Sequence, residues 1–373
     1  MHKPDRPISL RQLSAFGRKL TEQRLLTSAN YVRTELPVRL AHRIRDMQKL
    51  PFGVIQNENM SYTYNLYFRT FETLRKIPEV KTLEQNDSFC KVLKQMLRDN
   101  LSIVPRTVMG ILETHGRMDT ERTDDFLTVL MKTRISRRVI AEQHLALTET
   151  FHSLEGAAND QVGEVFSNLN AKQAVEQCAS AIRSFARDAY GKDAKLPEVT
   201  IQGHLNATFT YIPSHLEYIL GELLRNSFQA VCENRRDKDS TPPPIEVTIC
   251  ESVQNVIIRI SDRGLGISHD FLYKHLWSFG PGPRRNVRLD SLKKLRIVED
   301  DTSAVAKPEH YDLSLNSFTT RPSNLRLGIG LPMSKLYAEY WAGSLEIHSL
   351  EGYGVDAFLQ LSKLGNQNEQ LSM

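Results

Sequence analysis

Residues 222–230 of this 373-residue chain read ELLRNSFQA, and they carry three polar side chains within a stretch that otherwise has the pattern of a buried helix. The periodicity predicts a helix from Ser214 to about Arg235, with leucine and isoleucine side chains along one face. Spacings of three and four residues gather a polar set on the other face, namely Tyr218, Glu222, Arg225, Asn226 and Gln229. A polar helix face is usually only solvated, so this pattern alone does not establish a ligand site.

A second segment with the composition of a ligand site is ISDRGLGIS, residues 260–268. A predicted strand ends in Asp262, and Gly264 and Gly266 follow at once. Glycines at this spacing let the backbone approach a ligand closely, and a carboxylate at a strand end can accept a hydrogen bond from an exocyclic amine. The alternative is a plain turn, because Asp-x-Gly is a common turn sequence.

Two further glycine pairs lie near the C-terminus. In RLGIGLPMSKLYAEYWAGS, residues 326–344, Gly328 and Gly330 lead into a helix predicted from about Ile329 to Trp341. Free N–H groups at the start of a helix, together with the helix dipole, favour an anion. In EGYGVDAFLQL, which begins at residue 351, a last Gly-x-Gly opens the final predicted strand.

The secondary-structure pattern divides the chain into two parts. Residues 9 to about 185 have the periodicity of long amphipathic helices, typical of a bundle. Short alternating segments such as EVTIQG, IEVTICES and NVIIRISD then predict strands between helices. We therefore expect an α+β protein, with a helical bundle over 1–168 followed by an α/β sandwich over 169–373. Residues 280–326, rich in Gly, Pro, Ser and charge, are interpreted as a long functional lid.

Composition excludes some classes of protein. The net charge of +4 comes from 48 basic and 44 acidic side chains without a long basic run, so a nucleic-acid partner is not expected. No apolar run approaches the ~18 residues of a membrane-spanning helix. The four cysteines are far apart, which indicates a reduced chain without structural zinc. The basic N-terminus suits an import signal or a first helix capped by Ser9.

The four segments described above resemble, in their order along the chain, the N, G1, G2 and G3 boxes of the GHKL ATPase superfamily. In that superfamily the four boxes form a nucleotide site of the Bergerat type. The chain has no Walker motif and no H-R-D or D-F-G kinase motif. The chain further resembles the mitochondrial α-ketoacid dehydrogenase kinases, and this similarity extends over the helical half. The segments that carry the resemblance are SANYVRTELPVRLAHRI, TRISRRVIAEQHLAL, YIPSHLEYILGELLRN and LPMSKLYAEYWAGSLEIHSLEGYG. That family has a helical bundle followed by a GHKL domain.

The resemblance implies a role for each matching residue. Glu222 would accept the proton of the attacking serine hydroxyl, and Asn226 would bind Mg²⁺ that bridges the ATP phosphates. Arg225 would contact phosphate, and Asp262 would receive the adenine amino group. The remaining positions would shape the pocket and lid, namely Gly264, Gly266, Gly328, Ile329, Gly330 and Leu331.

The resemblance also implies a function. It indicates a mitochondrial matrix kinase that uses ATP and Mg²⁺ to phosphorylate and inactivate the dehydrogenase α subunit of the pyruvate dehydrogenase complex. The branched-chain α-ketoacid dehydrogenase is the alternative target. The implied partners are the lipoyl domain of the acyltransferase core, docking on the helical half, and a second copy of the chain in a homodimer.

Several positions depart from the family pattern. Arg326 replaces a glycine, Val355 replaces a threonine, Asn100 replaces a histidine, and the tail NQNEQLSM lacks an Asp-Trp pair. Arg326 and Val355 keep open a nucleotide-gated binding protein with little kinase activity. A third class, the two-component histidine kinases, would need an acceptor histidine, for which His144 is the nearest candidate and a core histidine the simpler interpretation.

Overall fold

The computed structural model describes residues 20–154, 167–191, 193–233, 241–294, 327–363 and 365. These residues fall into two compact units, one up to residue 154 and the other from residue 167 onward. The first is helical and the second combines helices with a sheet, so the predicted α+β class is confirmed. None of the described helices is both long enough and apolar enough to cross a membrane.

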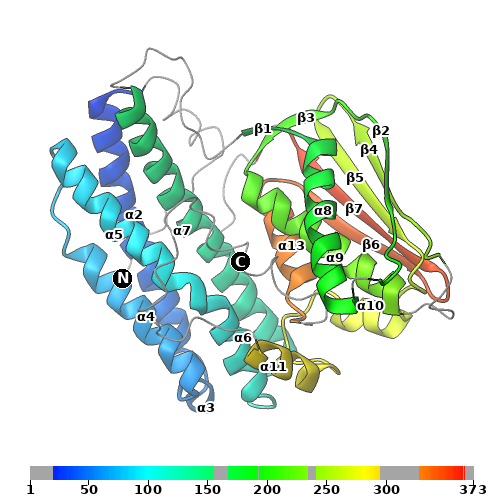
Figure 1. The fold of residues 1–373 in the computed structure, drawn as a ribbon. Helices are drawn as coiled ribbons and strands as arrows, with labels where there is room; N and C mark the ends of the chain where they lie inside the picture. The colour runs from blue at the N-terminus through cyan, green and yellow to red at the C-terminus, as the bar shows by residue number, and fades with distance from the viewer. Residues whose placement is uncertain are drawn as a thin grey trace. The chain divides into compact units, whose positions relative to one another are not determined.

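The first unit is a bundle of long helices joined by short connections (Figure 1). Its described elements are α2 (Glu22–Gln48), α3 (Phe52–Ile55), α4 (Glu58–Arg75), α5 (Leu83–Asp99), the 3₁₀ helix η1 (Asn100–Ser102), α6 (Ile103–Glu113) and α7 (Thr120–Leu154).

Side-chain caps begin several of these helices. The hydroxyl of Thr21 accepts the N–H of Arg24 at the start of α2, Asn57 caps α4, and Thr82 caps α5. Pro37 lies within α2, so it does not end the helix, whereas Pro51 precedes α3. Helix α2 packs against α4, α5 and α7, and this places its apolar side chains at the centre of the bundle.

The second unit begins with a short strand that the sequence analysis did not predict. Its described elements are β1 (Ser167–Asn170), α8 (Ala171–Tyr190), β2 (Val199–Gly203), β3 (Thr208–Tyr211), α9 (Pro213–Glu233), β4 (Ile245–Glu251), β5 (Asn255–Asp262), α10 (His269–His275), α11 (Arg285–Lys294), α13 (Gly330–Tyr340), β6 (Ser344–Leu350) and β7 (Gly354–Ser362).

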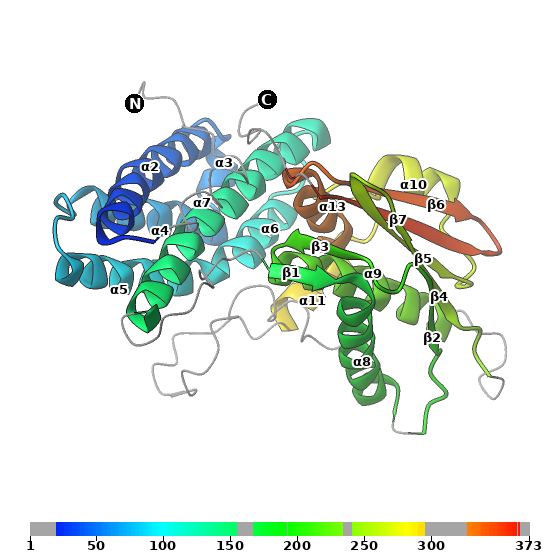
Figure 2. The ribbon, with the colours of Figure 1, turned by 90° about the horizontal axis from the view of Figure 1, so that it is seen from above.

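A five-stranded sheet in the order β2-β4-β5-β7-β6 forms the base of this unit. Strands β2 and β4 are parallel and the other neighbours are antiparallel, while β1 and β3 form a separate two-stranded sheet. Helices α8, α9 and α13 lie on one side of the five-stranded sheet in both views (Figures 1 and 2). Alternate residues of β5 are buried, as expected for a sheet with one covered face.

Two helices depart from the sequence prediction. Helix α10 was not predicted, and α11 lies in the stretch 280–326, for which regular structure was not expected. The prediction was wrong for 285–294 because Leu289 and Leu292 of α11 are buried and supply apolar anchors. Residues 295–326 of that stretch, including Arg326, lie outside the described residues, as do Ser9 and the tail NQNEQLSM.

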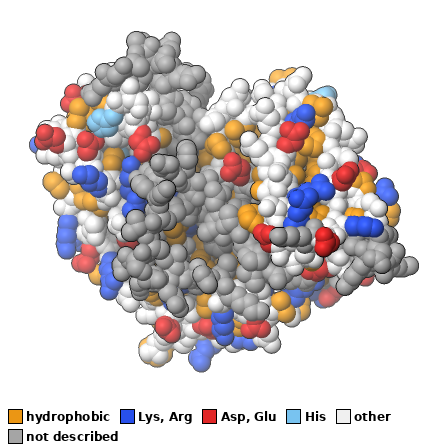
Figure 3. Space-filling model, in the orientation of Figure 1, with side chains coloured by type: hydrophobic (Ala, Val, Ile, Leu, Met, Phe, Trp, Pro, Cys, Tyr) orange, Lys and Arg blue, Asp and Glu red, His pale blue; other side chains and the backbone are white. Residues whose placement is uncertain are grey.

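Charged side chains of both signs are interspersed over the face shown in Figure 3. None of the four cysteines, all of which lie within the described ranges, forms a disulfide.

Candidate active site

Helix α9 holds the first group of predicted site residues, and it is buried on nearly every side. It packs against α8, α13 and strand β5. Tyr218, Glu222 and Arg225 are 1–2% exposed, so the helix face that the sequence analysis interpreted as polar is covered by neighbouring elements. Tyr218, for example, lies against the ring of Tyr337 from α13. The polar groups on this face are therefore enclosed by the protein, with Asn226 only half-buried.

Glu222 lies between an arginine and a glycine. Its carboxylate is 3.8 Å from the guanidinium of Arg225, and both side chains are 2% exposed. Gly330 begins α13 directly beside the carboxylate, because a Cβ at residue 330 would overlap Glu222 Oε2. A buried carboxylate requires a compensating charge, and Arg225 supplies it. The structure therefore places Arg225 as the ion-pair partner of Glu222.

Asp262 reaches the covered side of the sheet through the alternation of β5. Val256, Ile258 and Ile260 are buried on that side, and Asp262 continues the series at 5% exposure. Its Oδ2 accepts the hydroxyl of Ser227 at 2.8 Å, and its Oδ1 accepts the main-chain N–H of Gly264 at 3.0 Å.

The environment of Asp262 changes its acidity. Burial raises the pKa of this carboxyl above its ordinary value, and the hydrogen bonds from Ser227, Gly264 and the main chain of Val355 act in the opposite direction. The carboxylate is therefore fixed in orientation by its donors while it is held in a poorly solvated position.

The loop after Asp262 is fastened to the turn between β6 and β7. The N–H of Gly352 donates to the carbonyl of Leu265 at 2.8 Å, and Leu265 N–H donates to Tyr353 at 3.3 Å. The hydroxyl of Ser349 accepts Ile267 N–H at 2.7 Å. The first and last glycine pairs of the sequence therefore belong to one hydrogen-bonded unit, and the last pair supports the first.

The remaining predicted residues lie at the start of α13. Gly328 is exposed with φ of +66°, a conformation that favours glycine, whereas Ile329 is buried. Gly330 and Leu331 open the helix. Main-chain N–H groups of such a segment are suited to binding an anion.

The structure thus brings several of the predicted residues into two groups next to α9. One contains Glu222, Arg225 and Gly330, and the other contains Asp262 and Gly264 next to Ser227. Three residues that support these groups were missed, namely Ser227, Ser349 and Arg288. Their partners lie 35, 82 and up to 39 residues away in the sequence, so no local pattern indicated them.

In the helical unit, His144 is a core residue. It is 0% exposed, its Nδ1 lies 3.1 Å from the Ser28 hydroxyl, and its Nε2 lies 3.7 Å from Cys90 Sγ. Burial lowers the pKa of His144 to about 4. A phosphoryl acceptor has to be accessible, so this position argues against the histidine-kinase interpretation.

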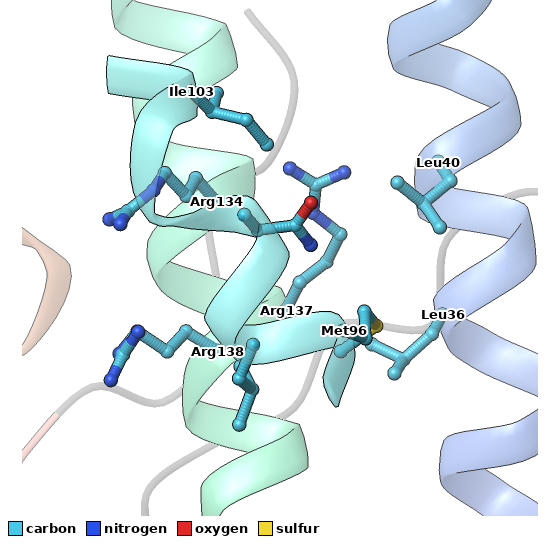
Figure 4. Close-up of a pocket in the computed structure, with 9 residues that line it drawn as sticks. Leu36, Leu40, Met96, Ile103, Arg134, Arg137 and Arg138 are labelled. Carbon is cyan, nitrogen blue, oxygen red and sulfur yellow. The ribbon is translucent and has the colours of Figure 1, made fainter. Parts of the chain in front are cut away.

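The helical unit also encloses a small cavity of about 20 Å³, shown in Figure 4. Arg137 extends toward Leu40 of α2, whereas Arg134 and Arg138 point away from that helix. Asn100, which departs from the family pattern, is part of the lining. Three arginines and Asn100 therefore contribute to the lining of an otherwise apolar space.

The class of protein follows from the second unit. This unit has a mixed sheet covered on one face, a helix that carries Asn226, an Asp-x-Gly-x-Gly loop and a glycine pair before a helix. These features together are the plan of the GHKL nucleotide-binding domain. A helical bundle precedes this domain in the chain, and proteins that combine the two form a smaller class.

Known proteins are similar in sequence to both parts of this chain. A sequence profile described as mitochondrial branched-chain alpha-ketoacid dehydrogenase kinase matches residues 7–166. Pyruvate dehydrogenase (acetyl-transferring) kinase 2, mitochondrial, of Saccharomyces cerevisiae is 32% identical over 98% of this chain and 84% of its own length. The mitochondrial pyruvate dehydrogenase kinase of Arabidopsis thaliana is 31% identical over 98% and 92%. The human isozyme 4 is 26% identical over 97% and 82%. The chain belongs to the family of mitochondrial α-ketoacid dehydrogenase kinases.

Proposed function

We propose that this protein is a mitochondrial protein-serine kinase that uses ATP to phosphorylate and inactivate the dehydrogenase α subunit of the pyruvate dehydrogenase complex. The observation that carries the proposal is the buried Glu222 carboxylate, which lies against the glycine that opens α13. The relatives named pyruvate dehydrogenase kinase, aligned over nearly the whole chain, support this choice of substrate and compartment.

The proposed chemistry is a direct phosphoryl transfer. Glu222 accepts the proton of the substrate serine hydroxyl while a bond forms between the serine oxygen and the γ-phosphorus. The bond between that phosphorus and the oxygen bridging to the β-phosphate breaks, and ADP leaves. Arg225 keeps the buried carboxylate compensated between turnovers. Most of the rate arises from positioning and from neutralising phosphate charge.

The residues present fit ATP and Mg²⁺. Asp262 offers a fixed, buried acceptor for the adenine amino group, and the exposed main chain of Gly328 offers N–H groups to phosphate. Asn226 is half-buried one helical turn from Glu222, and its amide oxygen is the kind of ligand that Mg²⁺ prefers. When bound, Mg²⁺ neutralises phosphate charge.

The decisive experiment compares the two complexes. The protein is incubated with ATP, Mg²⁺ and either purified pyruvate dehydrogenase or branched-chain dehydrogenase complex, and the phosphosite is mapped by mass spectrometry. We expect a phosphoserine on the pyruvate dehydrogenase α subunit and loss of that complex's activity. Modification of the branched-chain complex alone would reassign the target, an outcome favoured by the description of the matched profile.

Transfer to neither complex would favour the second class of function, a nucleotide-gated binding protein. The departures at Arg326 and Val355 motivate this alternative. Val355 pairs with Asp262 across β5 and β7, and its main chain donates to the Asp262 carboxylate. Residue 355 therefore interacts with the proposed adenine acceptor through its main chain, and the missing threonine hydroxyl leaves this interaction intact.

Asn226 gives a test of the metal proposal. Asn226→Ala removes the proposed Mg²⁺ ligand, so we expect ATP affinity to become insensitive to Mg²⁺. Calorimetry with and without Mg²⁺ measures this, and Gln229→Ala, one turn along the same helix, serves as the control. A Mg²⁺ dependence equal to that of the wild type would remove Asn226 from the metal site.

A further inference from the structure

One arginine outside the predicted site binds three main-chain carbonyls. Arg288 lies on α11 and is 6% exposed. Its Nε donates to the carbonyl of Leu327 at 3.0 Å, its Nη2 donates to Phe279 at 2.9 Å, and its Nη1 donates to Gly280. A buried guanidinium is costly unless its N–H groups find acceptors, and here backbone oxygens receive them.

These carbonyls come from two distant segments. Phe279 and Gly280 lie a few residues before α11, which begins at Arg285, whereas Leu327 lies 39 residues after Arg288. The next residue, Gly328, packs directly on the arginine, because a Cβ there would overlap Arg288 Nε. The planar fork of a guanidinium can reach acceptors on both segments at once, which the single ammonium of lysine cannot do in the same geometry.

The position of Gly328 matters for the site. Two residues later Gly330 begins α13 and lies against the Glu222 carboxylate. A displacement of Leu327 would therefore move both the exposed main chain of Gly328 and the neighbour of Glu222. Arg288 is connected to the site through this short segment of backbone.

We propose that Arg288 is a positioning residue that holds the phosphate-binding main chain of 328–330 in place beside Glu222. The inference rests on the proposed ATP site. Arg288 acts through Leu327 and Gly328, while the adenine acceptor Asp262 belongs to a different loop, fastened to the β6–β7 turn. Loss of Arg288 therefore affects recognition of phosphates and leaves recognition of adenine intact.

The test compares a nucleotide with a nucleoside. ADP with Mg²⁺ and adenosine are titrated into the full-length wild type, Arg288→Gln and Arg288→Lys, by calorimetry and by NMR respectively. We expect Arg288→Gln to weaken ADP binding about tenfold, the size of one charge-assisted hydrogen bond, without changing adenosine affinity. Arg288→Lys should recover part of the loss. Lys293→Gln, an exposed charge on the same helix, should behave as the wild type.

Two results overturn the proposal. Equal losses of ADP and adenosine affinity indicate a general structural role, and wild-type ADP affinity in Arg288→Lys shows that the fork is not required. The ADP affinity of Arg288→Lys still tests the proposal if Arg288→Gln does not fold. A wild-type protein that binds ADP but phosphorylates neither complex removes the kinase proposal and leaves this one standing. A wild-type protein that does not bind ADP removes the nucleotide site and this inference together.

Discussion

At the scale of single residues, the site is built from buried polar groups with assigned partners. Glu222 is compensated by Arg225, and Asp262 accepts hydrogen bonds from Ser227 and Gly264. Each of these groups would be costly if its partner were removed, because burial leaves no water to replace it. For single substitutions at these residues, we can therefore predict whether nucleotide affinity, phosphotransfer and stability rise or fall.

Glu222→Gln separates binding from chemistry. The two side chains are nearly isosteric, so the pocket is retained while the proton acceptor is lost. We expect nucleotide affinity to remain and phosphotransfer to fall by about 10²–10⁴, the usual contribution of a general base. Single-turnover transfer and calorimetry measure the two quantities, with Glu233→Gln on the exposed end of α9 as control. Wild-type turnover in the variant would show that Glu222 is not the base.

Ser227→Ala tests the environment of Asp262. Its hydroxyl helps to lower a pKa that burial has raised, so its removal should raise the pKa of Asp262 further. Protonation removes the acceptor for adenine. We therefore expect ADP affinity to fall as the pH drops through the folded-state pKa, and to begin falling at a higher pH in the variant. Calorimetry over a pH series measures this shift.

The raised pKa of Asp262 also determines the direction in which stability changes with pH. A raised pKa means that the contribution of Asp262 to stability is largest below its unfolded-state pKa and is lost as the pH rises through the folded-state pKa. Ser227→Ala should thus cost about 2 kcal/mol at neutral pH, as expected for a hydrogen bond to a charged group, and less in acid. Ser252→Ala on the exposed turn after β4 is the control. Identical pH profiles for wild type and Ser227→Ala would contradict the assignment.

At the scale of elements, the site lies where two helices meet above the end of a strand. Helix α9 packs on β5, and α13 packs on α9, β6 and β7. Residue 330, where α13 begins, lies against Glu222 of α9, and the absence of a side chain there admits the Glu222 carboxylate. The contact between the helices thus determines where the proposed base lies.

Gly330→Ala tests this contact. Alanine is the better helix former by about 1 kcal/mol, so helix propensity alone predicts a gain in stability. The added Cβ would instead displace the flexible end of Glu222, and we expect little net change in unfolding temperature together with a loss of phosphotransfer of at least about tenfold. Ser334→Ala, one turn further along α13, controls for substitution in this helix. Full activity in Gly330→Ala would show that the position of the carboxylate is not critical.

At the scale of the whole molecule, the chain contains two units with different physical characters. The helical unit has a core of its own and a cavity near three arginines, and the sheet unit carries all of the proposed nucleotide contacts. We propose that the helical unit binds the lipoyl domain of the acyltransferase core, and that the protein is a homodimer in the mitochondrial matrix. Docking would raise the concentration of kinase near its substrate.

A pull-down with the full chain tests the docking proposal. Lipoylated domain immobilised on beads should retain the protein, and the same domain without the lipoyl group should retain much less, because the lipoyl group supplies apolar contact area. Retained protein is quantified on gels, with lipoylated domain blocked by excess free domain as control. Equal recovery on both forms of the domain would contradict the proposal.

Local patterns determined the succession of elements. The helices α9 and α13, and the strands β2, β4, β5 and β7, were each predicted to within a few residues, because apolar periodicity reflects which face is buried. The strand β1 and the helices α10 and α11 were missed, since short elements carry little periodicity. Glu222 and Asp262 were predicted as site residues from local features, because Glu222 shares a helix face with Asn226 and Asp262 ends a strand just before Gly264 and Gly266.

What the sequence by itself determined about this protein is therefore the α+β class and the family, and it supplied the prediction of the central site residues. Only the tertiary structure decided how those residues are held. It buried the face of α9 that spacing alone marked as polar, paired Arg225 with Glu222, and brought Ser227 and Arg288 to acceptors far away in the chain. The physical reason is that burial and hydrogen bonding depend on packing between distant segments, whereas periodicity records only the preferences of each segment alone.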